Sequence, residues 1–561
     1  MYKFTCKDNH YQTYQYVETK TFQPIDHITQ TPTQLKLFVN DVFDYNENGF
    51  ILYHSSFKCN KMNPGILNLT MTYGKEKNKF LYLCKPDDKR IPFFLIPYNK
   101  PLEFDKSVEK LYITFEFKHW NNERPYGTVT QNLGNITILN HYYEYALYCK
   151  SLNISIQKFN KEVKEKLQHQ NNQLLIKTIA TQHNMENRNK SDYYIFTLDS
   201  SQSNDYDDAI SYDKKEHKIS IYITNVALIM DHLDLWGAFS NRISTIYLPD
   251  RKRTMLPSLL IDALCSLKEK EYKLCYVLDL FYDENNELKN HEFKTCRAYI
   301  RKNVSYDDHT FFETNETFQS ILSILKIKHS KQIITKLMLL FNHYVAMALW
   351  EKKEGIYKML QQEKIEEEQN PNIPTHVYEH ICILKNKAAK YCSYNPNIVY
   401  QSSIHKDIHI YTQVSSPIRR LVDLLNNIKF LHLLCSIKMS DKSIQFYDKW
   451  TTHENMEYIN ISSRAIRKIQ SKCMIYKQYE INKSKGEQPL YKGYIFDKAY
   501  KEGDGKYQYM VYVPCINLTT YVTLIEDLIN YSCHCFSLYV FMNQENDKQK
   551  IKLQLCYEES L

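Results

Sequence analysis

Glycine is the feature that most constrains this chain. Only 11 of its 561 residues are glycine, and between Gly134 and Gly486 the only glycines are Gly237 and Gly355. A phosphate-binding loop, a dinucleotide-binding fingerprint and a hydrolase nucleophile elbow each need two or more glycines within a few residues, because the backbone must approach a ligand closely or turn with positive φ. The middle of the chain therefore excludes all three kinds of site.

Length and composition indicate a multidomain globular protein that stays inside the cell. At roughly 100–200 residues per domain, 561 residues leave room for three or four domains. The sequence shows no long uncharged apolar window, so we expect no membrane segment. The N-terminus does not resemble a signal peptide, and the 15 cysteines are scattered along the chain as expected of reduced thiols. We expect a cytoplasmic location, with the nucleus or a viral setting as alternatives, and the net charge of +8 permits nucleic acid as a partner.

The pattern of apolar residues divides the chain into β-rich ends and an α/β centre. Short β-rich runs separated by polar turns predict a small barrel near each end, and a stretch with helical spacing connects the first barrel to the centre, with a loop at 184–190. We expect helices over 318–360, 376–393 and 417–485, and an acidic linker from Glu363 to Pro374. The predicted domains are 1–65, an N-terminal region to which the pattern assigns no fold; 66–150, a barrel; 151–190, a connector; 191–485, an α/β domain with a helical C-terminal part; and 486–561, a second barrel.

Four carboxylates lie within ten residues in the loop that follows the predicted strand ending at Leu198. They are Asp199, Asp205, Asp207 and Asp208. Such a cluster repels itself in a folded protein unless cations neutralise it, and hard oxygen ligands suit Mg²⁺ or Mn²⁺. The loop therefore indicates a magnesium site.

A solvated surface loop and a calcium-binding loop are the two alternatives to a magnesium site. A solvated surface loop accounts for the charge without any ligand. A calcium-binding EF-hand loop does not fit, because with Asp199 in first position the sixth residue is Asn204, where glycine is required, and the twelfth is Ile210, where glutamate is required.

The segment Ser415–Asp423 is the second chemical signal. Ser416 can cap a helix that begins at Pro417, and an apolar face continues from there. Arg419 and Arg420 would then lie in the first turn, where free backbone N–H groups already favour an anion, and Asp423 would steady one of them. Phosphate is the expected anion. A purely structural salt bridge is the alternative for this arginine pair.

Together these segments resemble the ribonuclease II / ribonuclease R (RNB) family of exoribonucleases. The acidic loop and SSPIRR match its two hallmarks, and the segments YLPDR at 247–251, MLP at 255–257 and LCSL at 264–267 match others in order and spacing. The resemblance covers about 190–480 strongly. The 491–557 region resembles the family's C-terminal OB-type RNA-binding domain. Five residues resemble the cold-shock barrel of the eukaryotic, exosome-type branch: Trp120, Pro125, Gly127, Leu133 and Gly134.

The resemblance implies a fold and an activity. The fold is an α/β catalytic RNB domain flanked by small OB-like or cold-shock-like β-barrels that surround one strand. The activity is processive 3′-5′ hydrolysis of single-stranded RNA to nucleoside 5′-monophosphates with two Mg²⁺ ions, for which Mn²⁺ can substitute. Metal ligands would be Asp199, Asp205, Asp207 and Asp208; catalytic residues would be Asp205, Asp207, Arg419 and Arg420; RNA-binding residues would be Tyr247, Arg251, Tyr306 and Ser416.

Some positions depart from the family pattern. They are Tyr222 and Asn225 in the segment where the family has HIADV, and Lys336, Gln413 and Asn427. They put rate and substrate preference in question more than reaction type. A core position is the alternative for Tyr306, and a catalytically weakened RNA-binding or scaffold protein is the alternative for the whole chain. The family's exosome subunit carries a PIN endonuclease domain for which we find no room, so we expect a monomer without an exosome core.

Overall fold

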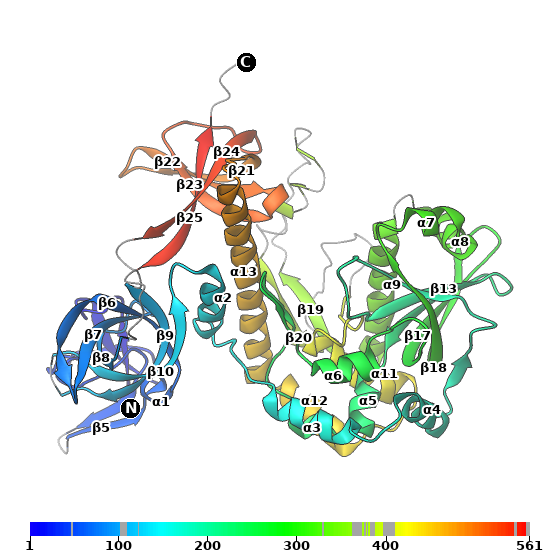
Figure 1. Cartoon of the computed structure of the whole chain (residues 1–561), viewed down its shortest axis with the longest axis horizontal. Helices are drawn as coiled ribbons and strands as arrows, with labels where there is room; N and C mark the ends of the chain where they lie inside the picture. The colour runs from blue at the N-terminus through cyan, green and yellow to red at the C-terminus, as the bar shows by residue number, and fades with distance from the viewer. Residues whose placement is uncertain are drawn as a thin grey trace. The chain divides into compact units, whose positions relative to one another are not determined.

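The computed structural model describes residues 1–46, 49–100, 109–121, 123–327, 330–361, 373–374, 377–378, 380–381, 387–396, 410–543 and 547–556 (Figure 1). The chain divides into two compact units. The terminal unit comprises Met1–Asn153, Leu248–Asp250 and Lys468–Leu561, and the central unit comprises Ile154–Tyr247 and Arg251–Arg467. The domain boundaries expected from the sequence stay predictions.

The terminal unit begins with a five-stranded antiparallel sheet in the order β3-β2-β1-β4-β5. Its aromatic residues, among them Phe4 and Phe43, share one hydrophobic core with the barrel that follows. The elements are β1 (Tyr2–Cys6), β2 (Tyr14–Glu18), β3 (Pro24–Ile25), β4 (Val42–Asn46), β5 (Gly49–His54) and the short helix α1 (Ser56–Cys59).

A closed five-stranded barrel follows, in the order β10-β8-β7-β6-β9. Its strands are β6 (Asn63–Glu76), β7 (Lys79–Pro86), β8 (Phe94–Tyr98), β9 (Lys110–His119) and β10 (Tyr126–Asn135). A Cβ atom at Gly127 would lie 2.9 Å from the carbonyl oxygen of Glu116 and 3.0 Å from the Phe115 ring, so only glycine allows β10 to pack this closely on β9. The barrel predicted from the β-rich pattern is confirmed.

The C-terminal part of the same unit is a second five-stranded antiparallel sheet, in the order β23-β22-β21-β24-β25. Asp547, which precedes β25 and is 2% exposed, accepts ion pairs from Lys85 at 2.8 Å and Lys110 at 2.6 Å. These contacts join the C-terminal sheet to the barrel. The elements are β21 (Leu490–Lys501), β22 (Lys506–Val513), η3 (Pro514–Ile516), β23 (Leu518–Leu524), β24 (Cys533–Asn543) and β25 (Lys548–Cys556).

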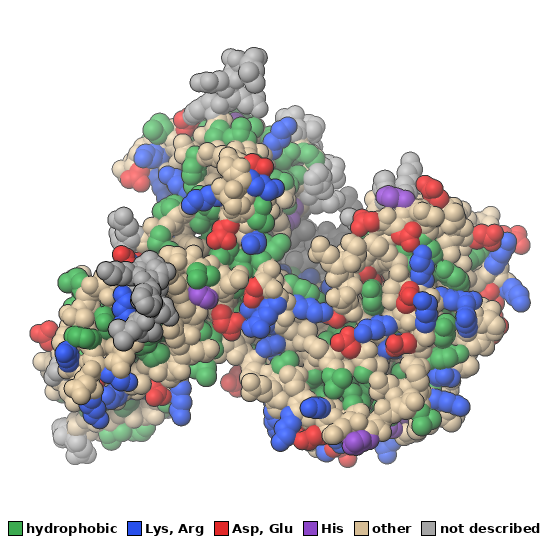
Figure 2. All heavy atoms as spheres, in the orientation of Figure 1, with side chains coloured by type: hydrophobic (Ala, Val, Ile, Leu, Met, Phe, Trp, Pro, Cys, Tyr) green, Lys and Arg blue, Asp and Glu red, His purple; other side chains and the backbone are tan. Residues whose placement is uncertain are grey.

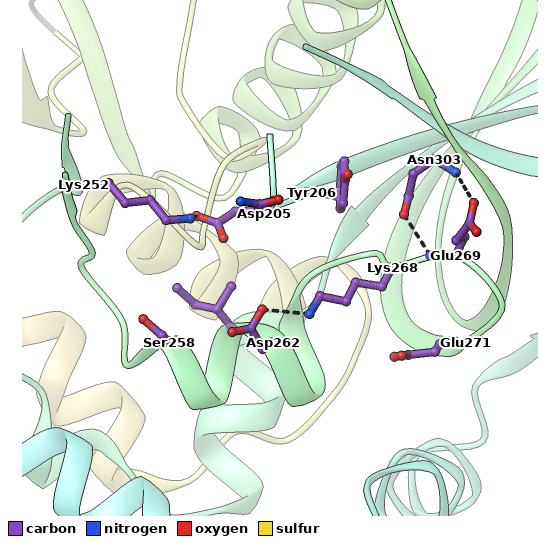
Figure 3. Close-up of a pocket in the computed structure, with 11 residues that line it drawn as sticks. Asp205, Tyr206, Lys252, Ser258, Asp262, Lys268, Glu269, Glu271 and Asn303 are labelled. Carbon is purple, nitrogen blue, oxygen red and sulfur yellow. Dashed lines mark hydrogen bonds and ion pairs between the residues drawn. The ribbon is translucent and has the colours of Figure 1, made fainter. Parts of the chain in front are cut away.

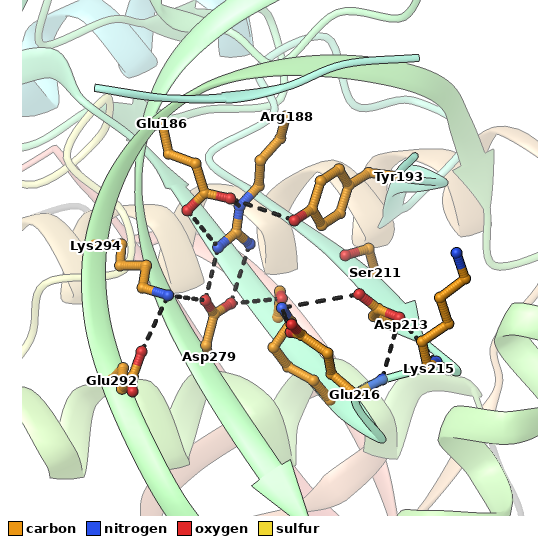
Figure 4. A network of polar contacts seen from close by, with 12 residues as sticks. Glu186, Arg188, Tyr193, Ser211, Asp213, Lys215, Glu216, Asp279, Glu292 and Lys294 are labelled. Carbon is orange, nitrogen blue, oxygen red and sulfur yellow. Dashed lines mark hydrogen bonds and ion pairs between the residues drawn. The ribbon is translucent and has the colours of Figure 1, made fainter. Parts of the chain in front are cut away.

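Helices α2 (Leu139–Tyr148), α3 (Gln157–Leu167) and α4 (Asn172–Gln182) lead from the barrel to the central unit. The predicted loop at 184–190 is wrong in part, because β11 (Glu186–Arg188) pairs with β18 there. The reason is Arg188, which is fully buried and makes a bidentate ion pair with Asp279, at 2.6 and 3.0 Å (Figure 4). That contact holds an otherwise polar segment against the sheet.

The central sheet has six strands in the order β11-β18-β12-β13-β14-β17, and β17 also pairs with β18. All seven residues of β14 are buried, so this strand is covered on both faces. Besides β11, the central sheet contains β12 (Ile195–Asp199), β13 (Asp208–Asp213), β14 (Lys218–Thr224), β17 (Tyr272–Tyr282) and β18 (Leu288–Ser305). Short elements between them are α5 (Val226–His232), η1 (Trp236–Ala238), β15 (Ile246–Tyr247), β16 (Lys252–Arg253), α6 (Ser258–Leu260) and η2 (Ile261–Cys265).

The helical part of the central unit contains α7 (His309–Thr314), α8 (Glu316–Leu325), α9 (Ser330–Glu351), α11 (Leu421–Leu434), α12 (Asp441–Thr451) and α13 (His453–Ser484), the last of which ends in the terminal unit. Among the described residues, α9 is the one helix long and apolar enough to cross a membrane, over Gln332–Glu351. Phe341, Val345 and Leu349 on this helix are fully buried, as in a core helix.

Two predicted helical segments contain strands instead. The end of 318–360 forms β19 (Ile356–Gln361), and the end of 376–393 forms β20 (Lys387–Ser393), which pairs with it. Tyr357, fully buried in β19, packs edge-on against Trp350 of α9, and Gly355 turns the chain between them with φ of 104°. The predicted acidic linker, except for its last two residues, lies outside the described residues.

Candidate functional site

The acidic loop joins two adjacent strands of the central sheet. Asp199 is the last residue of β12 and Asp208 is the first residue of β13, and the two strands pair through Phe196 and Ile210. Because both strands are buried, the loop starts and ends inside the protein. Asp207 and Asp208 are consequently only 5% and 8% exposed. The surface-loop interpretation is wrong for these two carboxylates.

Burial raises the pKa values of three carboxyl groups, those of Asp199, Asp207 and Asp208. Burial, together with the neighbouring Asp207, raises the pKa of Asp199 to about 7. Burial raises the pKa of Asp207 to about 6 although Arg419 opposes the shift. The pKa of Asp208 lies well above its usual value because it is buried beside both other carboxyl groups. Three negative charges in this environment are unfavourable without a cation.

The donor atoms fit a hard divalent cation at Asp199 and Asp208. One carboxylate oxygen of each, Oδ2, is buried without a hydrogen-bond partner in the described structure. Unpartnered buried carboxylate oxygens are the ligands that Mg²⁺ and Mn²⁺ prefer. Across the described ranges, however, the side chains form no complete group of three or more His, Cys, Asp or Glu ligands. Asp205 and Asp207 are turned instead toward basic side chains of the protein.

Asp207 joins the acidic loop to the SSPIRR segment, which is more than 200 residues away in the chain. Its Oδ1 accepts a hydrogen bond from the backbone N–H of Ile418 at 2.9 Å, and its Oδ2 pairs with Nε of Arg419 at 3.2 Å. The Arg419 side chain remains about half exposed. The two motifs therefore meet at one site, with Arg419 directed at the carboxylates.

The predicted helix start at Pro417 is wrong, because α11 begins at Leu421 and Arg420 has extended backbone geometry. Residues before it form a turn, in which the Ser416 carbonyl accepts hydrogen bonds from the N–H groups of Arg419 and Arg420. The N–H of Ile418, one of the backbone groups in this segment that were expected to favour an anion, binds Asp207. Tertiary contacts therefore keep this segment out of the helix.

Asp423 holds the turn from the first turn of α11. Its Oδ1 accepts hydrogen bonds from the backbone N–H of Ser416 at 2.8 Å and from Arg420 at 2.7 Å. The predicted pairing of Asp423 with one arginine is therefore confirmed for Arg420. Ser416 also accepts a hydrogen bond from Arg419 through its hydroxyl, at 2.8 Å. The two arginines differ in role, since Arg420 is bound to a fully buried structural carboxylate and Arg419 faces the acidic loop.

Asp205 pairs with Lys252 of β16 at 2.7 Å. The pair lies in a pocket of about 580 Å³ that also exposes Tyr206, Lys268 and Asp262 (Figure 3). Sequence reasoning missed Lys252. The signal that could have found it is its position directly after the YLPDR motif; in the structure it pairs with Tyr247 of that motif.

The predicted RNA-binding residues are only partly brought together. The backbone N–H of Tyr306 donates to the Asp199 carbonyl at 2.8 Å, and burial beside Asp199 and Asp208 raises the pKa of Tyr306 to about 12. Tyr247 is 44% exposed, and its pKa is raised by burial of the hydroxyl and by the charges of Asp207 and Asp205, although Arg419 opposes the shift. Arg251 is exposed between β15 and β16. RNA contact stays a prediction for all of them.

Two departures from the family pattern are buried structural positions. Tyr222 is fully buried, and its hydroxyl lies 2.9 Å from both Nη1 of Arg188 and Oγ of Ser211. Asn225 caps α5, since its side-chain oxygen accepts the N–H of Leu228 at 3.1 Å. Asparagine and aspartate serve equally well as helix caps, so this replacement preserves the local structure.

The other three departures also make intramolecular contacts. Gln413 accepts a hydrogen bond from the Tyr391 hydroxyl, and Asn427 donates to the Val414 carbonyl at 3.3 Å. Lys336 donates to the carbonyl of the last residue of α8 at 3.0 Å. A cation is favourable at a helix C-terminus.

Comparison with known proteins agrees with this geometry. Residues 186–320 match the family model of the RNB domain, and residues 81–145 match that of the Dis3-like cold-shock domain 2. The DIS3-like exonuclease 2 of Schizosaccharomyces pombe is 26% identical over 238 residues, a match that spans 40% of this chain and only 25% of that protein. The curated relatives are therefore matched over a minor part of their length.

Two solved structures share the fold over most of the chain. The Mycoplasma genitalium RNase R in complex with ribose methylated single-stranded RNA has a TM-score of 0.65 at 14% identity, over 98% of this chain and 96% of that one. Yeast Ssd1, described as a pseudonuclease, has a TM-score of 0.60 at 14% identity, over 92% and 73%. At such identities the likeness shows the fold alone.

These findings define a protein with an α/β central domain and OB-like β-sheet domains. More particularly, the chain carries an RNB domain and a Dis3-like cold-shock domain, and the resemblance to the RNB exoribonucleases is confirmed. On the face in Figure 2, basic and acidic side chains are interspersed rather than gathered into one basic patch. The net charge of +8 is therefore a weaker pointer to RNA than the site itself.

Proposed function

We propose that this protein is a processive exoribonuclease that hydrolyses single-stranded RNA from the 3′ end and releases nucleoside 5′-monophosphates. One observation carries the proposal: the buried carboxyl groups of Asp207 and Asp208 and the half-buried one of Asp199, all with raised pKa values, lie together with Arg419 from a distant segment. Groups with perturbed pKa values beside a half-exposed cation are typical of a reaction centre. The match to the RNB domain and the likeness to a DIS3-like exonuclease support this reaction class.

Asp199 and Asp208 are the residues that would hold Mg²⁺, for which Mn²⁺ can substitute. When bound, the metal supplies an activated water and stabilises charge on the leaving 3′ oxygen. A second ion near Asp207, which the two-metal form of the reaction requires, needs the Arg419–Asp207 ion pair to open. Asp205 would join the ligands only if Lys252 released it.

Arg419 has the chemistry to bind the scissile phosphate. Its guanidinium is half exposed and its contact with Asp207 uses Nε, so the two Nη groups retain donors for phosphate oxygens. A charged donor that strengthens as negative charge develops lowers the barrier of phosphoryl transfer. Arg420 instead supports the turn through Asp423.

Burial of the acidic loop restricts what can reach it. Because Asp207 and Asp208 are almost covered, the end of a single RNA strand, and not of a duplex, would have to enter the site to bring a phosphate to them. The Tyr306 ring beside these carboxylates offers a stacking surface for a terminal base, which fixes the position of the RNA without reading its sequence.

We further propose that the protein acts inside the cell and that it is a monomer. Sedimentation of the purified chain would test the oligomeric state.

The test is degradation of 5′-labelled RNA with product sizes resolved. We expect stepwise shortening from the 3′ end, mononucleotide products, and arrest by EDTA. Three substrates sharpen the test: a single strand, a blunt duplex and a duplex with a 3′ overhang. The blunt duplex should resist, and the overhang should be trimmed. Equal rates on all three would contradict insertion of a single strand, and release of nucleoside diphosphates only on addition of phosphate would contradict hydrolysis.

A second candidate is an RNA-binding protein that does not hydrolyse its ligand. It is favoured by the ion pairs of Asp205 with Lys252 and Asp207 with Arg419, through which the protein neutralises two of the four carboxylates itself. The fold is shared with a pseudonuclease as well as with a nuclease. Tight RNA binding without any product in the presence of Mg²⁺ or Mn²⁺ would establish this candidate.

A further inference from the structure

The terminal unit contains a cavity of about 230 Å³ that the proposed RNA hydrolysis does not use. Its lining comes from the barrel, from α2, from α13 and from the start of β25. We propose that this cavity binds a free nucleoside monophosphate, with its base against tyrosine rings and its phosphate on lysines. The site goes beyond the proposed function and does not depend on it.

Tyrosine rings form the apolar part of the cavity. Tyr112 and Tyr145 stack on one another with ring centroids 4.3 Å apart, and Tyr142 meets the Tyr476 ring edge-on at 5.3 Å. Tyr142 is partly exposed, whereas Tyr112 and Tyr145 are buried. Aromatic side chains offer a stacking surface that any nucleobase can use. Because Tyr112 and Tyr145 are buried against each other, the partly exposed Tyr142 is the ring that a flat aromatic group in the cavity can contact.

Lysines of α13 supply the positive side. Lys468 and Lys472 lie one turn apart on this helix, and a third lysine of the lining, Lys548 at the start of β25, is paired with Asp87. The Lys472 ammonium lies 5.6 Å from the Tyr142 ring centroid and 5.4 Å from that of Tyr476. Burial lowers the pKa of Lys472, and the charges of Lys548 and Lys468 lower it further. Clustered ammonium groups of this kind favour a bound anion.

The acidic groups of the lining are already neutralised. Asp547 is bound by Lys85 and Lys110, which do not line the cavity, and Asp87 is bound by Lys548 at 2.6 Å. Within the described part of the chain, neither Lys468 nor Lys472 makes an ion pair. The net charge available to a ligand is therefore positive, which selects an anion over a cation.

Size and hydrogen bonding narrow the ligand further. A volume of about 230 Å³ lies below the roughly 300–1,000 Å³ of drug-sized sites, so a monophosphate with a pyrimidine base fits better than a nucleoside triphosphate. The side-chain oxygen of Gln549, which also lines the cavity, is buried with no partner in the described structure. It can accept a hydrogen bond from an N–H group of the base.

The test is calorimetric titration of the full chain with UMP, uridine and inorganic phosphate. The chain carries Asp207→Asn, so that no added RNA is degraded. We expect UMP to bind and phosphate or uridine alone to bind at least tenfold more weakly. The double variant Lys468→Gln/Lys472→Gln should weaken UMP binding at least tenfold, whereas Lys477→Gln, an exposed lysine of the same helix outside the cavity, should not. Melting curves verify that each variant is folded.

RNA is the other source of the same chemistry, and a labelled oligouridylate separates the two. Unchanged oligouridylate affinity at saturating UMP supports a separate site for the free nucleotide. Competition between UMP and the oligomer, with both weakened in the double variant, would assign the cavity to the RNA strand and overturn the proposal. So would absence of UMP binding at millimolar concentration, or equal UMP affinity in a folded double variant. None of these outcomes bears on cleavage, because each measures binding.

Discussion

The central sheet buries charge in two places and satisfies it in opposite ways. Arg188 and Asp279, both fully buried, face each other with two hydrogen bonds, and Ser220 donates a third to Asp279 at 2.6 Å (Figure 4). At the ends of β12 and β13, the Asp199 and Asp208 carboxyl groups each keep an oxygen without a partner. The first cluster is complete within the protein and the second is not.

The pKa values follow the same division. Burial would raise the pKa of Asp279, but the hydrogen bonds and charge of Arg188 outweigh it, and the pKa is lowered. Burial also raises the pKa values of Asp199 and Asp208, and there the neighbouring carboxyl groups add to the shift. A complete buried ion pair indicates a structural role, whereas an incomplete carboxylate cluster indicates a site for something the protein binds. Variants in each of the two clusters test this difference in role.

The largest expected effect is the loss of cleavage in Asp207→Asn. The change removes a negative charge that Arg419 and Ile418 orient, so activity should fall below detection while RNA affinity stays nearly unchanged, because less negative charge repels the phosphate. RNA cleavage and filter binding are the measurements. Asp213→Asn, at the other end of β13, is the matched control and should keep its activity. Loss of RNA binding together with activity would mean that Asp207 organises the fold.

Next in size is the destabilisation caused by Arg188→Met. It leaves Asp279 buried without its cation, which should lower the free energy of unfolding by about 3–5 kcal/mol. Lys294, which is 40% exposed and lies 3.7 Å from the same carboxylate, is the matched control, and Lys294→Met should cost less than about 1 kcal/mol. Urea unfolding measures both. Equal effects of the two variants would refute the structural role of the buried pair.

Arg419→Ala should raise the barrier of the cleavage step by about 2–4 kcal/mol, because it removes the cation that stabilises the phosphate in the transition state. The fold should be destabilised less than in Arg420→Ala, since Arg419 is about half exposed and Asp207 keeps its hydrogen bond from the Ile418 N–H. Arg420→Ala should instead lower the free energy of unfolding, because Asp423 is fully buried and would lose its partner. Single-turnover rates and urea unfolding distinguish the two. A normal rate in Arg419→Ala with a slow one in Arg420→Ala would reverse the assignment.

The sequence predicted which residues lie together in the site more accurately than it predicted the local backbone structure around them. The resemblance of these motifs to the RNB family implied that Asp199, Asp207, Asp208 and Arg419 belong to one site, because a family motif records which side chains act together. The cap residue and the apolar face wrongly predicted a helix start at Pro417, where the Ile418 N–H binds a carboxylate more than 200 residues away. Local propensity carries no information about such a partner.

The remaining errors share this physical cause. The strand β11 exists because Arg188 reaches a carboxylate on β17, and β19 and β20 depend on pairing with one another. Lys252 was missed because its partner Asp205 is 47 residues away and nothing in the charge pattern links them. The barrel was predicted correctly because alternation along each strand is a local signal.

The smallest expected effect is a pH-dependent stabilisation by Asp199→Asn, measured with EDTA present. In the unfolded chain Asp199 loses its proton near its ordinary pKa of 3.8, whereas in the folded protein it keeps the proton up to about 7. The folded state therefore binds more protons between these values, and this residue makes stability fall as the pH rises through that window. The variant lacks the titration, so its advantage over the wild type should grow steadily between about pH 4 and about pH 7. Asp279→Asn should behave oppositely, since the lowered pKa of Asp279 contributes stability above its unfolded value that is lost as the pH falls through the folded one. Urea unfolding at several pH values checks both signs. The same sign in both variants would show that the two clusters are satisfied alike, and that the carboxylates at the ends of β12 and β13 need no cation.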